Sequence, residues 1–481
     1  MSKLYFIPGS QDLYGDECLR QVAADCKEMV SFLSDKLKGI VDIELLPTVE
    51  TSKICVQDMR KAQADDECVG VITWMHTFSP AKMWIKGLQE LRKPLLHLHT
   101  QANEKLPYDE IDMDFMNLNQ AAHGDREYGY ILARLNIPHE VVAGYYKHDN
   151  VVNKICQFAR VAKAIALSHN TLVATFGNNM RDVAVTDGNR LESEIKYGWE
   201  IKYWGIGEIA KLANEATDSE VDKKMAEYES KYTIATDNIE AVKEQARYEV
   251  AFDKFIEKNG VTAFTDTFQD LHGMKQLPGI AAQNLMAKGI GFGPEGDYKI
   301  AAFSSVCMKM AEGLDGATGF IEDYTYDLTE GEELELASHM LEVPASFAAN
   351  KPEIQAHPLG IGGKEDPARL VFDGVTGDGI QVTLVDMGDH FRIICADIEL
   401  VKQPKPMPKL PVARIMYRHK PNFEIGTAGW CYAGGAHHAV VSTALDRSDI
   451  AMFARITGTE LICIGDDTTE ADLQKFFMPK Y

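Results

Sequence analysis

The stretch CVGVITWMHTFSPAKMWIKGLQELRKPLLHLHTQ, residues 68–101, decides the fold of the first third of this chain. Residues 68–76 and 93–101 are largely apolar and favour strands, whereas residues 79–92 carry apolar side chains at helical spacing. Near-continuously apolar strands joined by a helix are typical of a parallel sheet with helices on both faces. The stretch therefore predicts a strand–helix–strand unit of an α/β domain.

The same alternation extends toward the N-terminus. Residues 3–9 and 41–49 favour strands, and residues 16–37 and 52–66 have helical periodicity. Together these segments predict a doubly wound parallel sheet, in which ligands bind beyond the carboxyl ends of the strands. Three polar segments follow strands and are expected at that edge: PGSQDLYG, HTFSPAKMW and HTQANEKLP.

Two further blocks follow along the chain. TLVATFGNNM, residues 171–180, opens a second α/β block, and a helix is expected over about residues 239–258. After about Leu314 the sequence changes to alternating strands with Gly and Asp turns, which predicts a barrel or sandwich. We predict three domains. Residues 1–170 would form an N-terminal doubly wound α/β domain, residues 171–316 a central α/β domain, and residues 317–481 a C-terminal β-rich barrel domain.

Composition limits the possible partners and the cell compartment. The formal net charge is −23, which disfavours nucleic acid and anionic membranes as partners. We see no leader-like N-terminal segment and no apolar run long enough to span a bilayer. The nine cysteines show no C-x-x-C pairing, which favours reduced thiols. We therefore expect a cytoplasmic protein.

Four segments carry possible metal ligands: Glu295 in GPEGD, Glu322 in FIEDYTYD, His339 inside the otherwise apolar strand expected over LELASHMLEV, and His437 with His438 in AGGAHHAV. Each also has an interpretation that involves no metal. Glu295 could be a solvated acid in a turn, and Glu322 could be a charge on an edge strand. His339 could be a core histidine that is hydrogen-bonded to the backbone, and the paired histidines could lie on the surface. In an extended segment adjacent side chains face opposite sides, so at most one of the paired histidines would reach a given ion. A set of carboxylates and imidazoles without thiolates suits Mn²⁺, Mg²⁺ or Co²⁺ better than zinc.

Long blocks spread over the whole chain resemble the L-arabinose isomerase family. They include GSQDLYG, HTFSPAKMWI, DMDFMNLNQAAHG, FGNNMRDVAVTDG, TFQDLHGMKQLPG, PEGDYK, EDYTY, SHMLEV, LGIGGKEDPARL and AGGAHHAV, in this order. The resemblance implies an α/β fold of two Rossmann-like α/β domains followed by a C-terminal β-barrel-like domain. It also implies a homohexamer built from trimers, with active sites shared between subunits.

The resemblance further implies roles for individual residues. The metal ligands match Glu295, Glu322, His339 and His438, with Mn²⁺ as the usual ion and Co²⁺ or Mg²⁺ as alternatives, and the two glutamates double as the catalytic acid–base pair. Residues around the sugar match Gln11, Leu13, Tyr14, Met180, Phe268 and Ile361. The blocks with Phe78, Gln120 and His123 resemble those lent across a subunit boundary. Asp12 departs from the family, which often has histidine there.

The expected activity is the reversible conversion of L-arabinose to L-ribulose through an enediol, with D-galactose to D-tagatose as a side activity. The sugar would be the small-molecule partner. A fucose-type sugar isomerase, a metal-dependent hydrolase and a non-catalytic sugar sensor remain as alternatives at this point.

Overall fold

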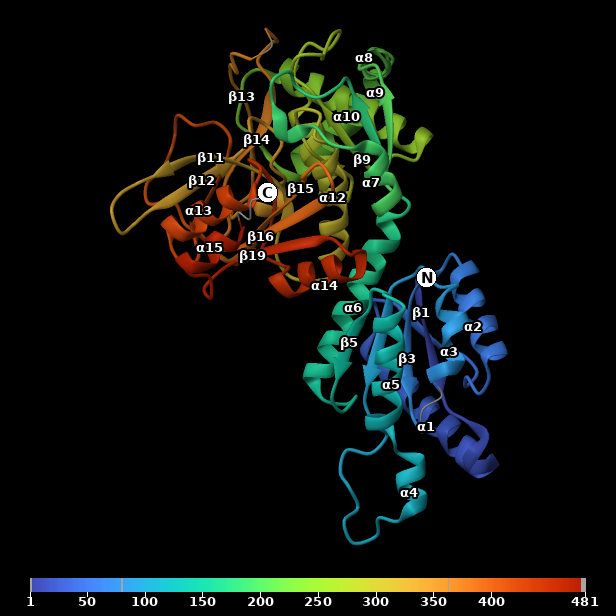
Figure 1. Cartoon of the computed structure of the whole chain (residues 1–481). Coiled ribbons are helices and arrows are strands. Elements are labelled where there is room, and N and C mark those ends of the chain that lie inside the picture. The colour runs from blue at the N-terminus through green and yellow to red at the C-terminus, as the bar shows by residue number, and fades with distance from the viewer. Residues whose placement is uncertain (1, 79–80, 362, 477–481) are drawn as a thin grey trace. The chain divides into compact units, whose positions relative to one another are not determined.

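The computed structural model describes residues 2–78, 81–361 and 363–476. The chain divides into two compact units, each with sheets and cores of its own (Figure 1). Unit 1 comprises residues 1–166 and 452–458, and unit 2 comprises residues 167–451 and 459–481. The predicted domain boundaries near residues 170 and 316 stay predictions.

Unit 1 is built on a five-stranded sheet of order β2-β1-β3-β4-β5, in which all neighbours are parallel. The strands are β1 (Lys3–Gly9), β2 (Asp42–Leu45), β3 (Cys68–Met75), β4 (Leu95–His99) and β5 (Glu140–Ala143). The helices along this part of the chain are α1 (Gly15–Lys36), α2 (Ser52–Ala64), α3 (Ala81–Leu88), α4 (Met113–Leu118), α5 (Ala121–Arg134) and α6 (Asp149–Ser168). The doubly wound α/β prediction is confirmed.

The central strand β3 explains why residues 68–101 decide this fold. All eight of its residues are buried, because β1 and β4 flank it and helices cover its faces. Helices α2 and α3 pack closely: a Cβ on Gly87 would lie 2.3 Å from the Sγ atom of Cys55. Only glycine permits this approach.

Unit 2 begins with a second parallel sheet of order β10-β9-β6-β7. Its strands are β6 (Leu172–Phe176), β7 (Glu200–Trp204), β9 (Ala263–Asp266) and β10 (Gly291–Phe292), and β8 (Thr233–Ile234) pairs elsewhere. The helices of this segment are α7 (Arg190–Tyr197), α8 (Gly207–Asn214), α9 (Asp218–Lys231), α10 (Ile239–Asn259), α11 (Gly279–Ala287) and α12 (Tyr298–Met310). The helix expected near residues 239–258 is therefore present as α10.

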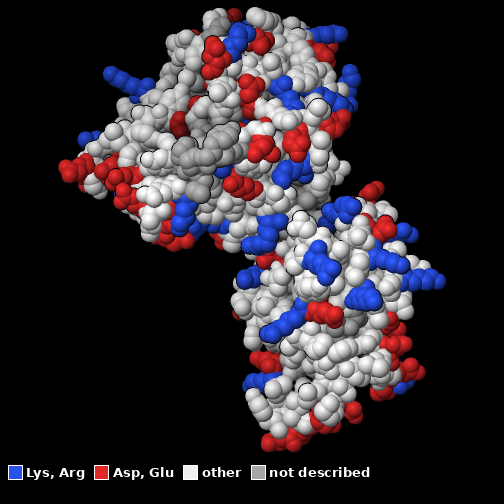
Figure 2. Space-filling model, in the orientation of Figure 1, with Lys and Arg blue, Asp and Glu red and all other residues white. Residues whose placement is uncertain are grey.

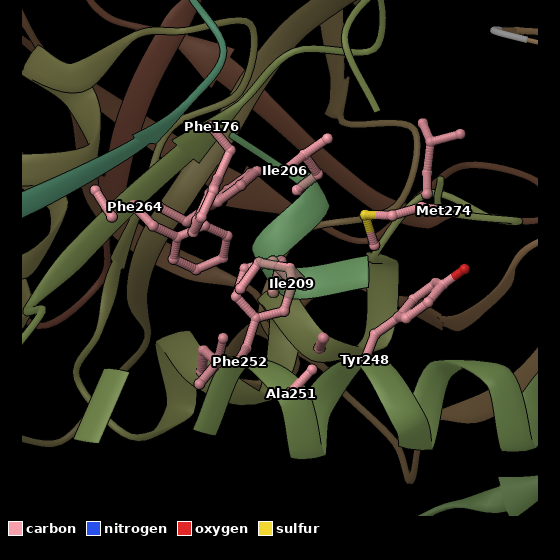
Figure 3. Packing of buried hydrophobic residues seen from close by; sticks show 14 of the residues in the cluster. Phe176, Ile206, Ile209, Tyr248, Ala251, Phe252, Phe264 and Met274 are labelled. Carbon is pink, nitrogen blue, oxygen red and sulfur yellow. The ribbon is translucent and has the colours of Figure 1, made fainter. Parts of the chain in front are cut away.

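Aromatic side chains fill the core of this sheet. Figure 3 shows Phe252 of α10 packing with Ile209 of α8 and the strand residues Phe176 and Phe264. The same cluster includes Phe320, from the following β-rich segment. The central sheet and the β-rich segment of unit 2 therefore share one hydrophobic core.

The C-terminal segment forms a closed barrel. Its strands are β11 (Thr318–Asp327), β12 (Leu334–Ser338), β13 (Glu353–Ala356), β14 (Ala368–Asp373), β15 (Gly377–Asp386), β16 (Phe391–Val401), β17 (Ala413–His419), β18 (His438–Ser442) and β19 (Glu460–Ile464). The order β16-β15-β18-β11-β12-β17 closes on itself through pairing of β16 with β17. The remaining helices are α13 (Phe423–Ala433), α14 (Arg447–Thr457) and α15 (Glu470–Phe476). Of the two forms expected from the sequence, the structure shows the barrel.

The described helices include none that is both long and apolar enough to cross a bilayer. On the face that Figure 2 shows, acidic and basic side chains are intermixed.

Candidate active site

Glu295 lies in the loop that leads from β10 into α12. Its backbone has φ 61°, the left-handed region that costs a non-glycine residue on the order of 1 kcal/mol or more. The loop is fixed from two sides: Glu295 O accepts the Met180 amide at 2.8 Å, and the Gly296 amide donates to Asp266 O at 3.0 Å. These contacts hold the Glu295 side chain at the carboxyl edge of the central sheet.

Glu322 and His438 come from neighbouring strands of the barrel. In the antiparallel pairing of β11 with β18, Glu322 lies directly opposite His438. On its other side Glu322 faces Ser338 of β12. The register therefore places one carboxylate and one imidazole, far apart in sequence, on adjacent strands.

His339 follows β12 directly. The sequence suggested that His339 lies inside a strand, but β12 ends at Ser338 and the imidazole is in the connection that follows. Its Nε2 atom lies 3.5 Å from Oε2 of Glu322. Phe268 stacks on the His339 ring with centroids 5.8 Å apart, and the edge of Phe320 packs against it. His339 is thus buried between aromatic side chains and turned toward the carboxylates.

Each of the two buried imidazoles is held from behind by a buried carboxylate. His438 Nδ1 donates to Asp297 Oδ2 at 3.1 Å, and His339 Nδ1 donates to Glu342 Oε2. Nε2 of His438 is buried, has no hydrogen-bond partner among the described residues and lies 3.7 Å from Glu295 Oε2. Both Nε2 atoms are therefore placed to act as ligands, as in carboxylate–histidine–metal triads.

A buried lysine supports Asp297 in turn. Lys299 Nζ lies 3.1 Å from Asp297 Oδ1 and donates to three backbone carbonyls, those of Val185, Thr186 and Asp187. Burial alone would raise the pKa of Asp297, but Lys299 and His438 outweigh it and hold this pKa below its ordinary value. Asp297 is therefore an ionised acceptor for His438.

The adjacent histidines do not face opposite sides. His437 Nε2 lies 3.6 Å from Glu295 Oε2 and 3.9 Å from Glu322 Oε1, so both imidazoles approach Glu295. The expectation from strand alternation is wrong here because His437 precedes β18, which begins at His438. Half-exposed His437 (37 %) therefore faces the same site as fully buried His438.

Opposite charges in the site shift its pKa values. Burial alone would raise the pKa of Glu295, but contact with His437 and the charge of the other imidazoles hold it below its ordinary value. The contact with Glu295 raises the pKa of His437. Burial alone would lower the pKa of His339, but Glu342 and the two glutamates raise it to about 9. The carboxylates of the site thus favour positive charge beside them.

The donor set fits a divalent cation. Glu295 and Glu322 could supply oxygens, and His339 and His438 could supply nitrogens. Within the described part of the chain, Nε2 of His438 and Oε2 of Glu295 are both buried without a hydrogen-bond partner. Such unpaired buried polar atoms are costly unless something binds them. Hard oxygen ligands with imidazoles suit Mn²⁺ or a similar ion.

Three of the residues expected around the sugar lie in unit 2. Met180 and Ile361 pack against the hydrophobic cluster that contains Phe268, and Phe268 stacks on His339. Phe268 therefore lies directly beside the polar centre, and Met180 and Ile361 belong to the apolar packing around Phe268. Such apolar packing excludes water from a small-molecule site.

The other six expected residues lie in unit 1. The amide of Gln120 approaches the Tyr14 hydroxyl at 3.4 Å, and the rings of Phe78 and His123 are 4.5 Å apart. Gln11 has a buried amide nitrogen that meets no acceptor among the described residues, and Leu13 is 67 % exposed. These residues gather at the carboxyl edge of the unit 1 sheet, where the sequence predicted a ligand-binding edge.

A cavity of about 260 Å³ borders His437 and is lined by Tyr324, Tyr326 and Trp430 among others. A roomier cavity of about 610 Å³ lies between α11 and α12, and its described lining residues include one carboxylate, Glu312, and no histidine. Neither cavity has Glu295, Glu322, His339 or His438 among its described lining residues, so the site is located by the short distances between these groups.

Asp297, Glu342 and Lys299 were not among the residues expected from the sequence. Two of them follow a proposed ligand closely, Asp297 two residues after Glu295 and Glu342 three residues after His339. That short spacing is the only signal the sequence carries for them, and it is common among ordinary turn acids.

Comparison with protein families gives three matches that together cover most of the chain. They are the L-arabinose isomerase N-terminal domain over residues 1–170, the central domain over residues 172–313 and the C-terminal domain over residues 317–460.

Proteins that are similar to this chain over nearly its whole length are also L-arabinose isomerases. The L-arabinose isomerase of Halalkalibacterium halodurans is 48 % identical over 98 % of this chain and 96 % of its own length. Those of Shouchella clausii and Thermotoga petrophila are 47 % and 46 % identical, each over 98 % of this chain and over 97 % and 96 % of their own lengths.

Proposed function

This chain belongs to the L-arabinose isomerase family, and we propose that it interconverts L-arabinose and L-ribulose with a divalent cation held among its clustered carboxylates and imidazoles. It is an aldose–ketose isomerase. Membership of this family favours isomerisation over hydrolysis, passive sugar sensing and fucose-type chemistry.

The proposed ligands are Glu295, Glu322, His339 and His438, and the proposed ion is Mn²⁺, with Co²⁺ or Mg²⁺ as substitutes. One observation carries this proposal: four segments distant in sequence converge, and each buried imidazole is backed by a carboxylate. Bound there, the ion would act as a Lewis acid on the sugar oxygens.

The chain's own groups move the protons. Aldose–ketose conversion transfers one proton between C2 and C1 and a second between the two oxygens. Glu295, ionised because its pKa is lowered, and Glu322 provide two carboxylates for these transfers, which we propose to pass through an enediol. His437 lies between their oxygens and is suited to hold a proton near the reacting sugar oxygen.

The remaining proposals concern substrate range, assembly and location. We propose D-galactose to D-tagatose as a side activity. We propose a cytoplasmic homohexamer in which Phe78, Gln120 and His123 of one subunit contact the sugar bound by another. Gln11, Leu13, Tyr14, Met180, Phe268 and Ile361 would complete the sugar site.

A ketose assay tests the metal proposal. Protein stripped of metal and incubated with L-arabinose should form no ketose, and added Mn²⁺ should restore ketose formation. Full activity in the stripped protein, with residual metal excluded by elemental analysis, would contradict the proposal.

A further inference from the structure

Asp125 forms a buried clamp at the carboxyl edge of the unit 1 sheet. Its Oδ1 atom accepts hydrogen bonds from the Met75 amide at 3.1 Å and from His97 Nε2 at 2.9 Å. Its Oδ2 atom accepts from His99 Nδ1 at 2.8 Å. The Asp125 side chain is 0 % exposed, and that of His99 is 32 % exposed. One carboxylate thus ties α5 to the ends of β3 and β4.

The same three side chains lie close enough to suggest a metal site, but the tautomer of His97 argues against one. Nδ1 of His97 is buried and meets no partner in the described ranges, so the ring proton is best placed on Nε2, where Asp125 accepts it. A metal on Nε2 would move that proton to Nδ1 and leave a buried N–H without an acceptor. At His339 and His438, by contrast, a carboxylate accepts the Nδ1 proton.

The helix end fixed by this clamp carries two residues of the proposed sugar site. Gln120 precedes α5 and His123 is in its first turn. The backbone N–H of Gln120 donates to the backbone oxygen of His76 at 3.1 Å, and a Cβ on Gly124 would lie 2.4 Å from the backbone oxygen of Thr77. The first turn of α5 therefore has little freedom to move relative to β3.

We propose that Asp125 is a positioning residue for substrate binding. It holds the start of α5 so that Gln120 and His123 keep their places beside Phe78, an inference that rests on the proposed role of these three residues in the sugar site. A carboxylate is required because all three neighbours donate and only an acceptor-only group with two oxygens serves them. An asparagine would turn an N–H₂ group toward one of the donors.

The Asp125→Asn variant tests this in the Mn²⁺-loaded enzyme. Loss of the clamp should raise KM for L-arabinose about tenfold while kcat stays within about twofold, because the reacting carboxylates belong to unit 2. Mn²⁺ affinity, measured by electron paramagnetic resonance, should not change. Asp58→Asn is the matched control: Asp58 is also a buried carboxyl of unit 1, on α2, and its replacement should leave KM unchanged.

Gln120→Ala and His123→Ala separate this inference from the proposed function. Raised KM in both, with unchanged KM in Asp125→Asn, would overturn the positioning role alone. Unchanged KM in both would overturn the positioning role together with the shared sugar site.

A milder variant keeps the positioning role testable if Asp125→Asn fails to fold. His99→Ala removes only the contact to Oδ2, from a partly exposed side chain, and a smaller KM rise is expected; an unchanged KM would overturn the role.

A titration with Co²⁺ tests whether Asp125 is a metal ligand instead. Wild-type protein that binds no ion at this cluster supports the clamp. A second bound equivalent of Co²⁺ that Asp125→Asn loses and Glu295→Gln keeps would show a metal site there and overturn the clamp.

Discussion

Asp297 accepts the Nδ1 proton of His438 across 3.1 Å, and this contact turns Nε2 of the imidazole toward Glu295. The pair joins the loop after β10 to strand β18. It fixes both the tautomer and the direction of one proposed metal ligand.

Replacement of Asp297 by Asn should therefore weaken Mn²⁺ binding about 10–100-fold. Asparagine retains an acceptor for the cap of α12 but loses the charge that orients His438. A titration of Mn²⁺ by electron paramagnetic resonance gives the affinity. Wild-type affinity in a folded Asp297→Asn protein would show that His438 needs no such support.

Glu295→Gln and Glu322→Gln should each lower kcat by a factor of about 100 or more, because a carboxylate needed for proton transfer becomes an amide. Circular dichroism should show an unchanged fold. Asp386→Asn, on strand β15, serves as a control with near-normal turnover. Near-normal ketose formation in either glutamine variant under saturating Mn²⁺ would rule that carboxylate out of the reaction.

The buried carboxyl of Asp266 should make the free energy of unfolding depend on pH. Its carboxyl is buried, and neither oxygen has a hydrogen-bond partner among the residues that the structure describes; burial and the nearby Glu342 raise its pKa from 3.8 to about 7. A raised acid pKa means that the folded state loses stability as pH rises from about 4 through 7. Asp266→Asn should therefore stabilise the metal-free protein, by up to about 4 kcal/mol at pH 8 and less at pH 5.

Urea unfolding at both pH values and one protein concentration checks this expectation. An equal effect of Asp266→Asn at pH 5 and pH 8 would show that the carboxyl does not titrate in this range.

Two glycines of unit 1 should respond oppositely to alanine. In Gly87→Ala the new Cβ meets Cys55 at 2.3 Å and should destabilise the protein by about 1–3 kcal/mol. In Gly129→Ala, on α5, the Cβ meets no described atom within 4 Å, and the higher helix propensity of alanine should stabilise by about 0.5–1 kcal/mol. Thermal unfolding of the two variants side by side measures the contrast, and equal midpoints would contradict the packing described for α2 and α3.

The sequence predicted the fold well where a local pattern determines it. The apolar run of residues 68–76 became the buried strand β3, and the alternating C-terminal segment became a barrel. Closure of that barrel depends on pairing Ile398–Val401 with Met416–His419. No local pattern specifies such a register, so the sequence left barrel and sandwich open.

Local sequence patterns predicted less of the site than of the fold. Glu295, Glu322, His339 and His438 belong to separate segments, and only the family resemblance grouped them. Strand alternation misplaced His437 because the rule applies inside a strand, and His437 lies before one. Asp297 and Glu342 act through contacts in space that their neighbours in sequence do not reveal.

The most direct measurement is anomalous scattering at the manganese edge from crystals soaked in Mn²⁺. The account predicts one strong peak, about 2.0–2.3 Å from an oxygen of Glu295, an oxygen of Glu322 and Nε2 of both His339 and His438. A structure in which Mn²⁺ binds elsewhere and contacts none of these four side chains would contradict it.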